Sequence, residues 1–321
     1  MCSSDLSTAA DGQMAVSLLK RLAAAGTPVD AMVLDIEMPG MDGLTAIPKL
    51  LDVDPQLKIV MASTLTLQNA SASLTALSLG ASDYVPKPTS ASAINGTAAF
   101  KREIVAKVKT LGGIRRDARG EGRPRVDGKD TAPEGGSPTR RAAAPTADCA
   151  IPIRRNVELP PAAIAIGSST GGPQALSSLL DKLPQGLRLP ILVTQHMPPT
   201  FTTILAQHLA KSSGIPAAEA IDGEQVHGGR IYVAPGDFHM IPVIEGSVVR
   251  LRLTRDAPEN FCRPSVDPMF RAATKVWGGR VIGIILTGMG KDGLAGGQAL
   301  VDAGGTLVAQ DEKTSVVWGM P

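Results

Sequence analysis

The stretch of residues 162–172 places the strongest constraint on how this chain can fold. It begins with a run of alanine and isoleucine, which is typical of a strand buried in a parallel sheet. It then breaks into the small residues 167–171, and Pro173 follows where we expect the first turn of a helix. The turn fits the G-x-S-x-G pattern of a nucleophile elbow, which selects Ser169 rather than Ser168. A phosphate-binding turn or a plain loop is the alternative interpretation.

Apolar strands alternate with helical patterns along most of the rest of the chain. Strands are expected at 31–35, 57–62, 83–85, 189–196, 230–237, 248–254, 281–286 and 306–309. Helices are expected at 13–25, 72–79, 96–111, 174–180, 201–211, 269–276 and 295–303. The two segments 230–237 and 248–254 are expected to flank a hairpin. Otherwise the alternation predicts an α/β fold with doubly wound, mostly parallel sheets, in which functional sites lie at the carboxyl ends of strands.

The composition changes between residues 112 and 160, where glycine, proline, alanine and arginine dominate. Few of these residues can bury a core, so we expect a flexible linker. Its arginines suit an acidic partner, but a solvated tether is the favoured interpretation. The linker divides the chain into a first domain of residues 1–111 and a second domain of residues 161–321.

Charge and cysteine content exclude several classes of function. The 321 residues carry a net charge of +2, which does not favour nucleic acid or an anionic membrane as a partner. Cys2, Cys149 and Cys262 are far apart and odd in number, so we expect a reducing compartment and no disulfide framework. No apolar run reaches spanning length, and the first twelve residues do not resemble a signal peptide. These features predict a cytoplasmic protein without membrane insertion.

Three side chains of the first domain, Asp35, Ser63 and Lys87, follow predicted strands. A carboxylate there can attack a phosphoryl group, while an ammonium and a hydroxyl can hold the resulting phosphate. The segment 35–43 resembles the phosphoacceptor segment of two-component receiver domains, Ser63 matches their switch residue, and Lys87 matches their Lys-Pro pair. The resemblance implies a flavodoxin-like receiver, phosphorylated on Asp35 by a CheA-type histidine kinase. For Asp35 alone, a helix-capping or turn acid is the alternative.

The beginning of the chain departs from this receiver pattern. Receivers begin with a strand followed by an acidic pair that holds Mg²⁺, whereas residues 1–12 carry no strand, and Asp5 is not a substitute for that pair. We therefore expect an incomplete receiver, cut at its N-terminus, with an incomplete Mg²⁺ site. Mg²⁺ binding and phosphorylation are expected of a full-length parent protein.

Three candidate catalytic side chains, Ser169, His196 and Asp292, each follow a predicted strand and precede a helix. Because a parallel sheet brings its strand ends to one edge, we expect the three to meet there. A hydroxyl, an imidazole and a carboxylate form a triad, in which His196 takes the proton of Ser169 and Asp292 orients the imidazole. The chain order Ser, His, Asp differs from that of ordinary α/β-hydrolases.

Other chemistry-bearing residues of the second domain receive weaker assignments. Asp267 is a rival acid, but we expect it to cap the helix that follows it. Cys262 is a weak nucleophile candidate because no histidine lies near it in sequence, and His239 is a minor candidate for the lining of the site. No pair of histidines has metal-ligand spacing, so we expect neither a metal nor another cofactor in this domain.

The second domain resembles the catalytic domain of the CheB family of chemotaxis methylesterases. The resemblance rests on five motifs, namely residues 166–172, 194–199, 232–236, 263–267 and 286–293. The segment 311–321 also fits, although the family continues beyond it, so both ends of the chain are expected to be cut. Receiver, linker and esterase in this order is the family's own architecture.

The resemblance implies hydrolysis of glutamate γ-methyl esters, and deamidation of certain glutamines, on methyl-accepting chemotaxis receptors. It also implies that the receiver covers the esterase until Asp35 is phosphorylated. Backbone N–H groups near Thr170 and Met289 are the expected oxyanion hole. Two alternatives stay open, namely a receiver-linked serine hydrolase of small esters and a regulator whose second domain only binds.

Overall fold

The computed structural model describes residues 6–64, 66–88, 93–120, 160–184 and 186–321. Most of the predicted linker, residues 121–159, therefore lies outside the described residues. Among the described helices, none is both long and apolar enough to cross a membrane.

The first domain is a parallel sheet of three strands with the order β1-β2-β3. Its strands are β1 (Ala31–Asp35), β2 (Lys58–Ser63) and β3 (Asp83–Pro86). Its helices are α1 (Gly12–Ala24), α2 (Gly43–Val53), α3 (Leu67–Ser78) and α4 (Ala93–Ala118). The first three helices begin where a side chain at the N-cap accepts a hydrogen bond from a backbone N–H of the first turn, and these residues are Asp11, Asp42 and Thr66.

Helix α4 ends at Ala118, so the prediction that the linker begins at residue 112 is wrong. The helix continues because its last turns pack and form ion pairs with the sheet domain. Leu111 is fully buried, Arg115 pairs with Asp54, and Arg116 pairs with Asp30. The composition of this segment concealed these contacts, since its arginines are typical of both a solvated tether and an ion-paired helix face.

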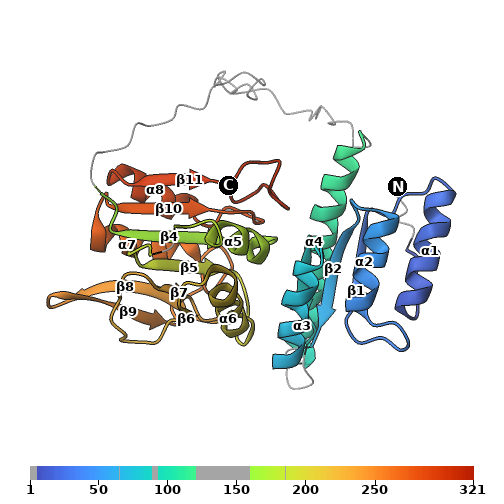
Figure 1. The fold of residues 1–321 in the computed structure, drawn as a ribbon, viewed down its shortest axis with the longest axis horizontal. Coiled ribbons are helices and arrows are strands. Elements are labelled where there is room, and N and C mark those ends of the chain that lie inside the picture. The colour runs from blue at the N-terminus through green and yellow to red at the C-terminus, as the bar shows by residue number, and fades with distance from the viewer. Residues whose placement is uncertain (1–5, 65, 89–92, 121–159, 185) are drawn as a thin grey trace, which may run out of the picture.

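The second domain contains a six-stranded parallel sheet with the order β11-β10-β4-β5-β7-β6 (Figure 1). Its strands are β4 (Ala163–Ser168), β5 (Ile191–Gln195), β6 (Ala217–Glu219), β7 (Ile231–Val233), β10 (Val281–Ile285) and β11 (Thr306–Ala309). Its helices are α5 (Gly172–Leu180), α6 (Phe201–Ser213), α7 (Val266–Trp277) and α8 (Leu294–Asp302). The two parallel sheets with interleaved helices confirm the predicted α/β fold class.

The hairpin of this domain differs from the predicted one. Strand β9 (Val248–Thr254) pairs with β8 (His239–Glu245), which the sequence pattern did not reveal, while β7 lies inside the parallel sheet. Pro242 interrupts the apolar alternation of β8, and proline is tolerated there because the strand lies at the edge of a two-stranded sheet.

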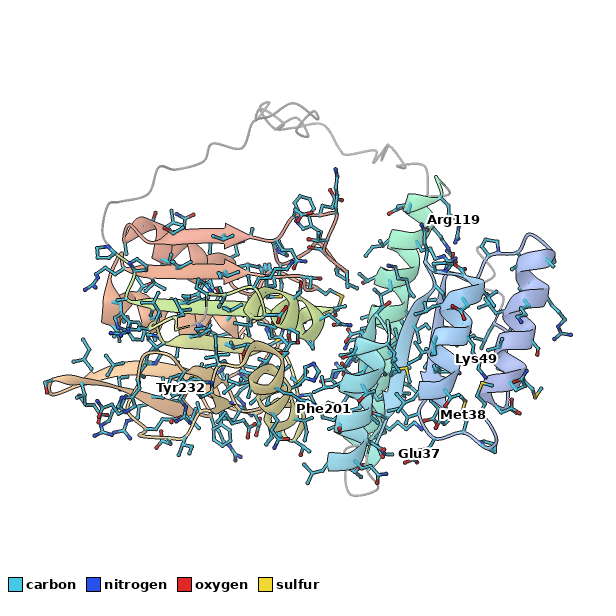
Figure 2. All side chains as sticks on the ribbon, viewed as in Figure 1. Glu37, Met38, Lys49, Arg119, Phe201 and Tyr232 are labelled. Atoms are coloured by element: carbon cyan, nitrogen blue, oxygen red, sulfur yellow. The ribbon has the colours of Figure 1, made fainter. Side chains whose placement is uncertain are left out.

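The two domains contact each other through helices of both (Figure 1). Helices α5 and α6 of the second domain lie on the side that faces α3 and α4 of the first. Figure 2 shows Phe201, the first residue of α6, on this facing side. The core extends across the boundary, since Val317 packs with Val60, Val85 and Leu111.

Candidate active site

The candidate catalytic residues follow three neighbouring strands and lie at one edge of the larger sheet. Strands β10, β4 and β5 are adjacent and parallel, and each is followed by a turn. Ser169 follows β4, His196 follows β5, and Asp292 lies in the turn between β10 and α8. The carboxyl ends of these strands therefore bring together three residues that are far apart in sequence.

Asp292 is buried and lies 2.7 Å from the Nε2 atom of His196 through its Oδ2 atom. It also accepts hydrogen bonds from the hydroxyl of Ser265 and the backbone N–H of Val266, each at 2.7 Å. Val266 opens helix α7, so the positive end of that helix faces the carboxylate. Burial raises the pKa of Asp292, but the contact with His196 and these hydrogen bonds outweigh it and hold the pKa at about 2.

The imidazole of His196 lies between Asp292 and a cysteine. Its Nδ1 atom, on the side away from Asp292, is 3.4 Å from the Sγ atom of Cys262. Burial lowers the pKa of His196, but the hydrogen bonds to Asp292 and Cys262 raise it to about 9 overall. At neutral pH the resting ring of His196 is therefore the positively charged imidazolium, which the carboxylate of Asp292 stabilises.

Ser169 and Ser168 have different environments in the turn after β4. Ser168 is fully buried, and its hydroxyl donates to Oε1 of Gln195 at 2.6 Å. Ser169 is half-buried, and its hydroxyl has no hydrogen-bond partner among the described residues. Gly288 lies against it so closely that a Cβ atom there would be 2.8 Å from that of Ser169. The structure therefore leaves the Ser169 hydroxyl available for reaction and holds the Ser168 hydroxyl in the core.

Two turns adjoin Ser169 and contain the residues expected to form an oxyanion hole. Thr170 follows Ser169 directly, and Met289 follows Gly288 in the turn after β10. Among the described residues, neither backbone N–H has a hydrogen-bond acceptor. Two such donors beside a serine hydroxyl are suited to stabilise a negatively charged oxygen.

Several contacts of the site were not predicted from the sequence. The side-chain amide of Asn260 donates to Asp292 at 3.0 Å and to Asp267 at 2.8 Å. Asp267 does not cap the helix that follows it, as we expected, because it lies inside α7. Its Oδ1 atom instead accepts from the N–H of Gly296 in the first turn of α8. His239 is buried and accepts from the N–H of Ser265, so it supports the loop that contacts Asp292. In the sequence, only the motif 263–267 pointed to these residues around Asp292.

The candidate phosphorylation site lies at the strand ends of the first domain. The ammonium of Lys87 pairs with Oδ2 of Asp35, and both side chains are about one-third exposed. The Ser63 hydroxyl is buried and accepts from that of Ser73 at 2.8 Å. Within the described parts of the chain, no three acidic, histidine or cysteine side chains form a metal-binding group. Because Mg²⁺ keeps several water ligands and needs only one or two carboxylates, its binding at this edge stays a prediction.

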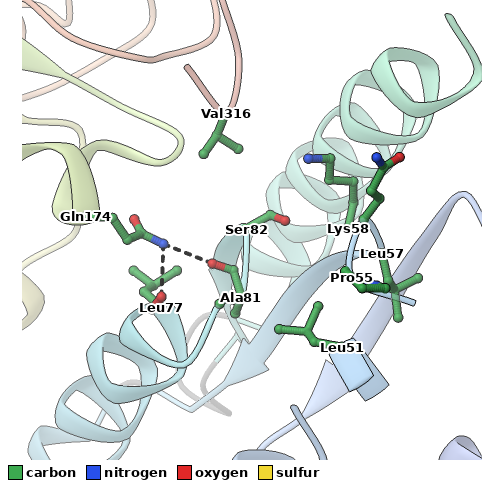
Figure 3. Close-up of a pocket in the computed structure, with 11 residues that line it drawn as sticks. Leu51, Pro55, Leu57, Lys58, Leu77, Ala81, Ser82, Gln174 and Val316 are labelled. Atoms are coloured by element: carbon green, nitrogen blue, oxygen red, sulfur yellow. Dashed lines mark hydrogen bonds between the residues drawn. The ribbon is translucent and has the colours of Figure 1, made fainter. Parts of the chain in front are cut away.

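The first domain contacts the turn that carries Ser169. The hydroxyl of Thr170 donates to Oδ2 of Asp83 at 2.7 Å, and both residues are buried. The rings of Tyr84 and Phe201 stack with centroids 4.6 Å apart. The adjoining pocket has a volume of about 290 Å³ and is lined in part by Gln174. The side-chain amide of Gln174 donates to the backbone carbonyls of Leu77 and Ala81 (Figure 3).

Both domains are similar to protein families that have been described. Residues 164–321 match the family described as CheB methylesterase, and residues 3–98 match the response regulator receiver domain. Protein-glutamate methylesterase/protein-glutamine glutaminase 1 of Paramagnetospirillum magneticum is 51% identical, over 97% of this chain and 81% of that protein. The enzyme of the same name, without the numeral, from Azospirillum brasilense is 55% identical, over 97% of this chain and 78% of that protein.

A solved structure of one domain is also similar to this chain. The crystal structure of the Thermotoga maritima CheB methylesterase catalytic domain is 42% identical, covers 51% of this chain and 86% of that chain, and has a TM-score of 0.49. The extent and identity of the two curated relatives decide the family. The chain therefore belongs to the CheB family of protein-glutamate methylesterases/protein-glutamine glutaminases, with a receiver domain ahead of the methylesterase domain.

Proposed function

We propose that this enzyme hydrolyses glutamyl γ-methyl esters on the cytoplasmic helices of methyl-accepting chemotaxis receptors, with Ser169, His196 and Asp292 as its catalytic residues. It also deamidates particular glutamines of the same receptors, and it acts in the cytoplasm. The observation that carries this proposal is the contact of His196 with the buried Asp292, placed one strand away from the free hydroxyl of Ser169. The family membership supports the choice of a protein-bound glutamyl ester as substrate.

The chemistry follows from the arrangement of these groups. The Ser169 oxygen attacks the ester carbonyl, while Nδ1 of His196, unprotonated in the reactive form, takes its proton. The C–O bond to the methoxy group then breaks, and the imidazolium returns the proton so that methanol leaves. Water attacks the acyl-enzyme with the same imidazole as base, which releases the glutamate side chain. A glutamine amide reacts by the same steps and releases ammonia in place of methanol.

Asp292 and the two turns lower the energy of the charged groups that form during the reaction. Asp292 holds Nε2 of His196 and stabilises the imidazolium that forms during acylation. The N–H groups of Thr170 and Met289 would receive the oxygen of the tetrahedral intermediate. Removal of one donor of this kind typically costs about 10²–10³-fold in kcat.

The receiver would control the esterase through the contacts between the domains. The Thr170–Asp83 hydrogen bond and the Tyr84–Phe201 stack attach the receiver beside the nucleophile. A phosphate on Asp35, donated by a CheA-type histidine kinase, would attract Lys87 and gain a hydrogen bond from Ser63. These new contacts would change the conformation of the receiver. The changed receiver would bind the esterase domain more weakly, so that a bulky receptor helix could reach the site.

The test of this proposal is methanol release from membranes that contain methyl-labelled receptors. The chain should release methanol, and Ser169→Ala should reduce the release by at least about 10³-fold. Ser168→Ala is the matched control, because its hydroxyl is buried against Gln195, and it should keep most of the activity. Turnover of small esters without methanol release from receptors would instead favour a general serine hydrolase.

A further inference from the structure

An exposed aromatic side chain lies beside the candidate active site, in the loop between β9 and α7. Phe261 is fully exposed, at 103% of the reference value, with the receiver in place. Its backbone has a φ angle of +64°, and that of Asn260 is +52°. A bulky residue in this region of backbone space is an outlier that the surrounding structure must hold in place.

The residues on both sides of Phe261 are fixed to the catalytic machinery. Asn260 donates to Asp292, and the Cys262 thiol contacts Nδ1 of His196. The next residue, Arg263, pairs with Asp237 at 2.6 Å. The loop is therefore held in one conformation while the aromatic ring itself has no burial, so packing within the chain does not explain the ring.

We propose that Phe261 is a docking anchor for the receptor helix that carries the substrate ester. This inference rests on the proposed function. When the ester carbonyl of a glutamyl side chain lies at Ser169, the helix that carries this side chain must extend over the surface around the site. Phe261 lies on that surface, since its neighbours in the chain contact His196 and Asp292. An apolar side chain on that helix would cover the ring and remove it from water.

The receiver is not the occupant of this surface. It is present in the structure and contacts α5, α6 and the turn at Thr170, yet Phe261 remains fully exposed. The ring is therefore accessible to an external partner even with the receiver in place.

The anchor has a characteristic kinetic signature, because Phe261 is proposed to contact the receptor helix and not the reacting atoms. Loss of the ring weakens the binding of the receptor by the same amount in the ground state and in the transition state. KM for the receptor therefore rises, and kcat stays unchanged. A small soluble ester does not extend to the rim, so its kcat/KM should not depend on Phe261.

The test compares Phe261→Asn, Phe261→Tyr and wild type on methylated receptor membranes and on a small methyl ester. Asparagine tolerates a positive φ, so it keeps the loop conformation while it removes the ring. We expect Phe261→Asn to raise KM for receptor about tenfold, as for an aromatic hot spot, and Phe261→Tyr to stay close to wild type. Ile244→Asn is the matched control, since Ile244 is 60% exposed on the β8–β9 hairpin.

Three results would overturn the anchor. An unchanged receptor KM for Phe261→Asn would show that the ring is not used. An equal loss on the small ester would mean that Phe261 only maintains the site. A change in the sedimentation of the free protein, with an unchanged receptor KM, would assign the ring to contacts between copies of the chain. Failure of the proposed function is distinct, because wild type itself would then release no methanol from receptors.

Discussion

Replacing Tyr84 by alanine should activate the esterase without a phosphodonor. Tyr84 is 4% exposed, and its ring stacks on that of Phe201 with 5° between the ring planes. Such a stack contributes about 0.5–1.5 kcal/mol beyond the burial of ring area. A loss of about 1.4 kcal/mol across the interface changes the ratio of open to closed domains tenfold.

Basal methanol release from methylated receptor membranes should therefore rise up to about tenfold in Tyr84→Ala, as long as the closed form predominates. Tyr84→Phe is the matched control, because it keeps the ring stacked on Phe201, and it should stay close to wild type. A small soluble ester tests whether the effect is one of access, since its hydrolysis should rise less than that of the receptor. If Tyr84→Ala releases methanol from receptors no faster than Tyr84→Phe, the ring stack does not hold the domains closed.

Other expected outcomes concern the charged groups of both domains. Asp292→Asn should reduce the initial rate of methanol release by about 10⁴-fold, because the amide neither fixes the His196 tautomer nor stabilises the imidazolium. With the pKa of His196 at about 9, kcat/KM for a neutral ester should rise with pH up to about 9 and then level, since only the unprotonated ring accepts the Ser169 proton; a profile flat from pH 7 to pH 9 would contradict this. Cys262→Ala should move the rising limb to lower pH in the same titration, because contact with Cys262 raises that pKa. Asp35→Asn should keep basal release while abolishing stimulation by a small phosphodonor, and stimulation that persists would place the control elsewhere.

The predicted placement of Ser169, His196 and Asp292 rested on local patterns and one topological rule. Each residue follows an apolar run, and a parallel sheet brings the ends of such runs to one edge. Strands β10, β4 and β5 are adjacent, so the three residues lie at one edge, where His196 contacts Asp292. The distinction between Ser169 and Ser168 came from the turn pattern alone, and the different surroundings of the two hydroxyls agree with it.

The contacts that the sequence did not reveal are those between residues far apart in the chain. Cys262 lies 66 residues from His196, and the β8–β9 hairpin separates them, so no local spacing indicates their contact. The Thr170–Asp83 hydrogen bond joins two domains in the same way. The length of α4 depended on ion pairs with Asp54 and Asp30, which composition cannot distinguish from a solvated tether.

Ser169 is proposed as the nucleophile of this methylesterase. The most direct measurement is peptide mapping after treatment with a serine-directed acylating reagent, on wild type, Ser168→Ala and Ser169→Ala. The adduct should form on Ser169 in wild type and in Ser168→Ala, should be absent from Ser169→Ala, and should appear in parallel with loss of esterase activity. An adduct on Ser168 or Cys262 that accompanies the loss of activity would contradict the assignment of Ser169 as nucleophile.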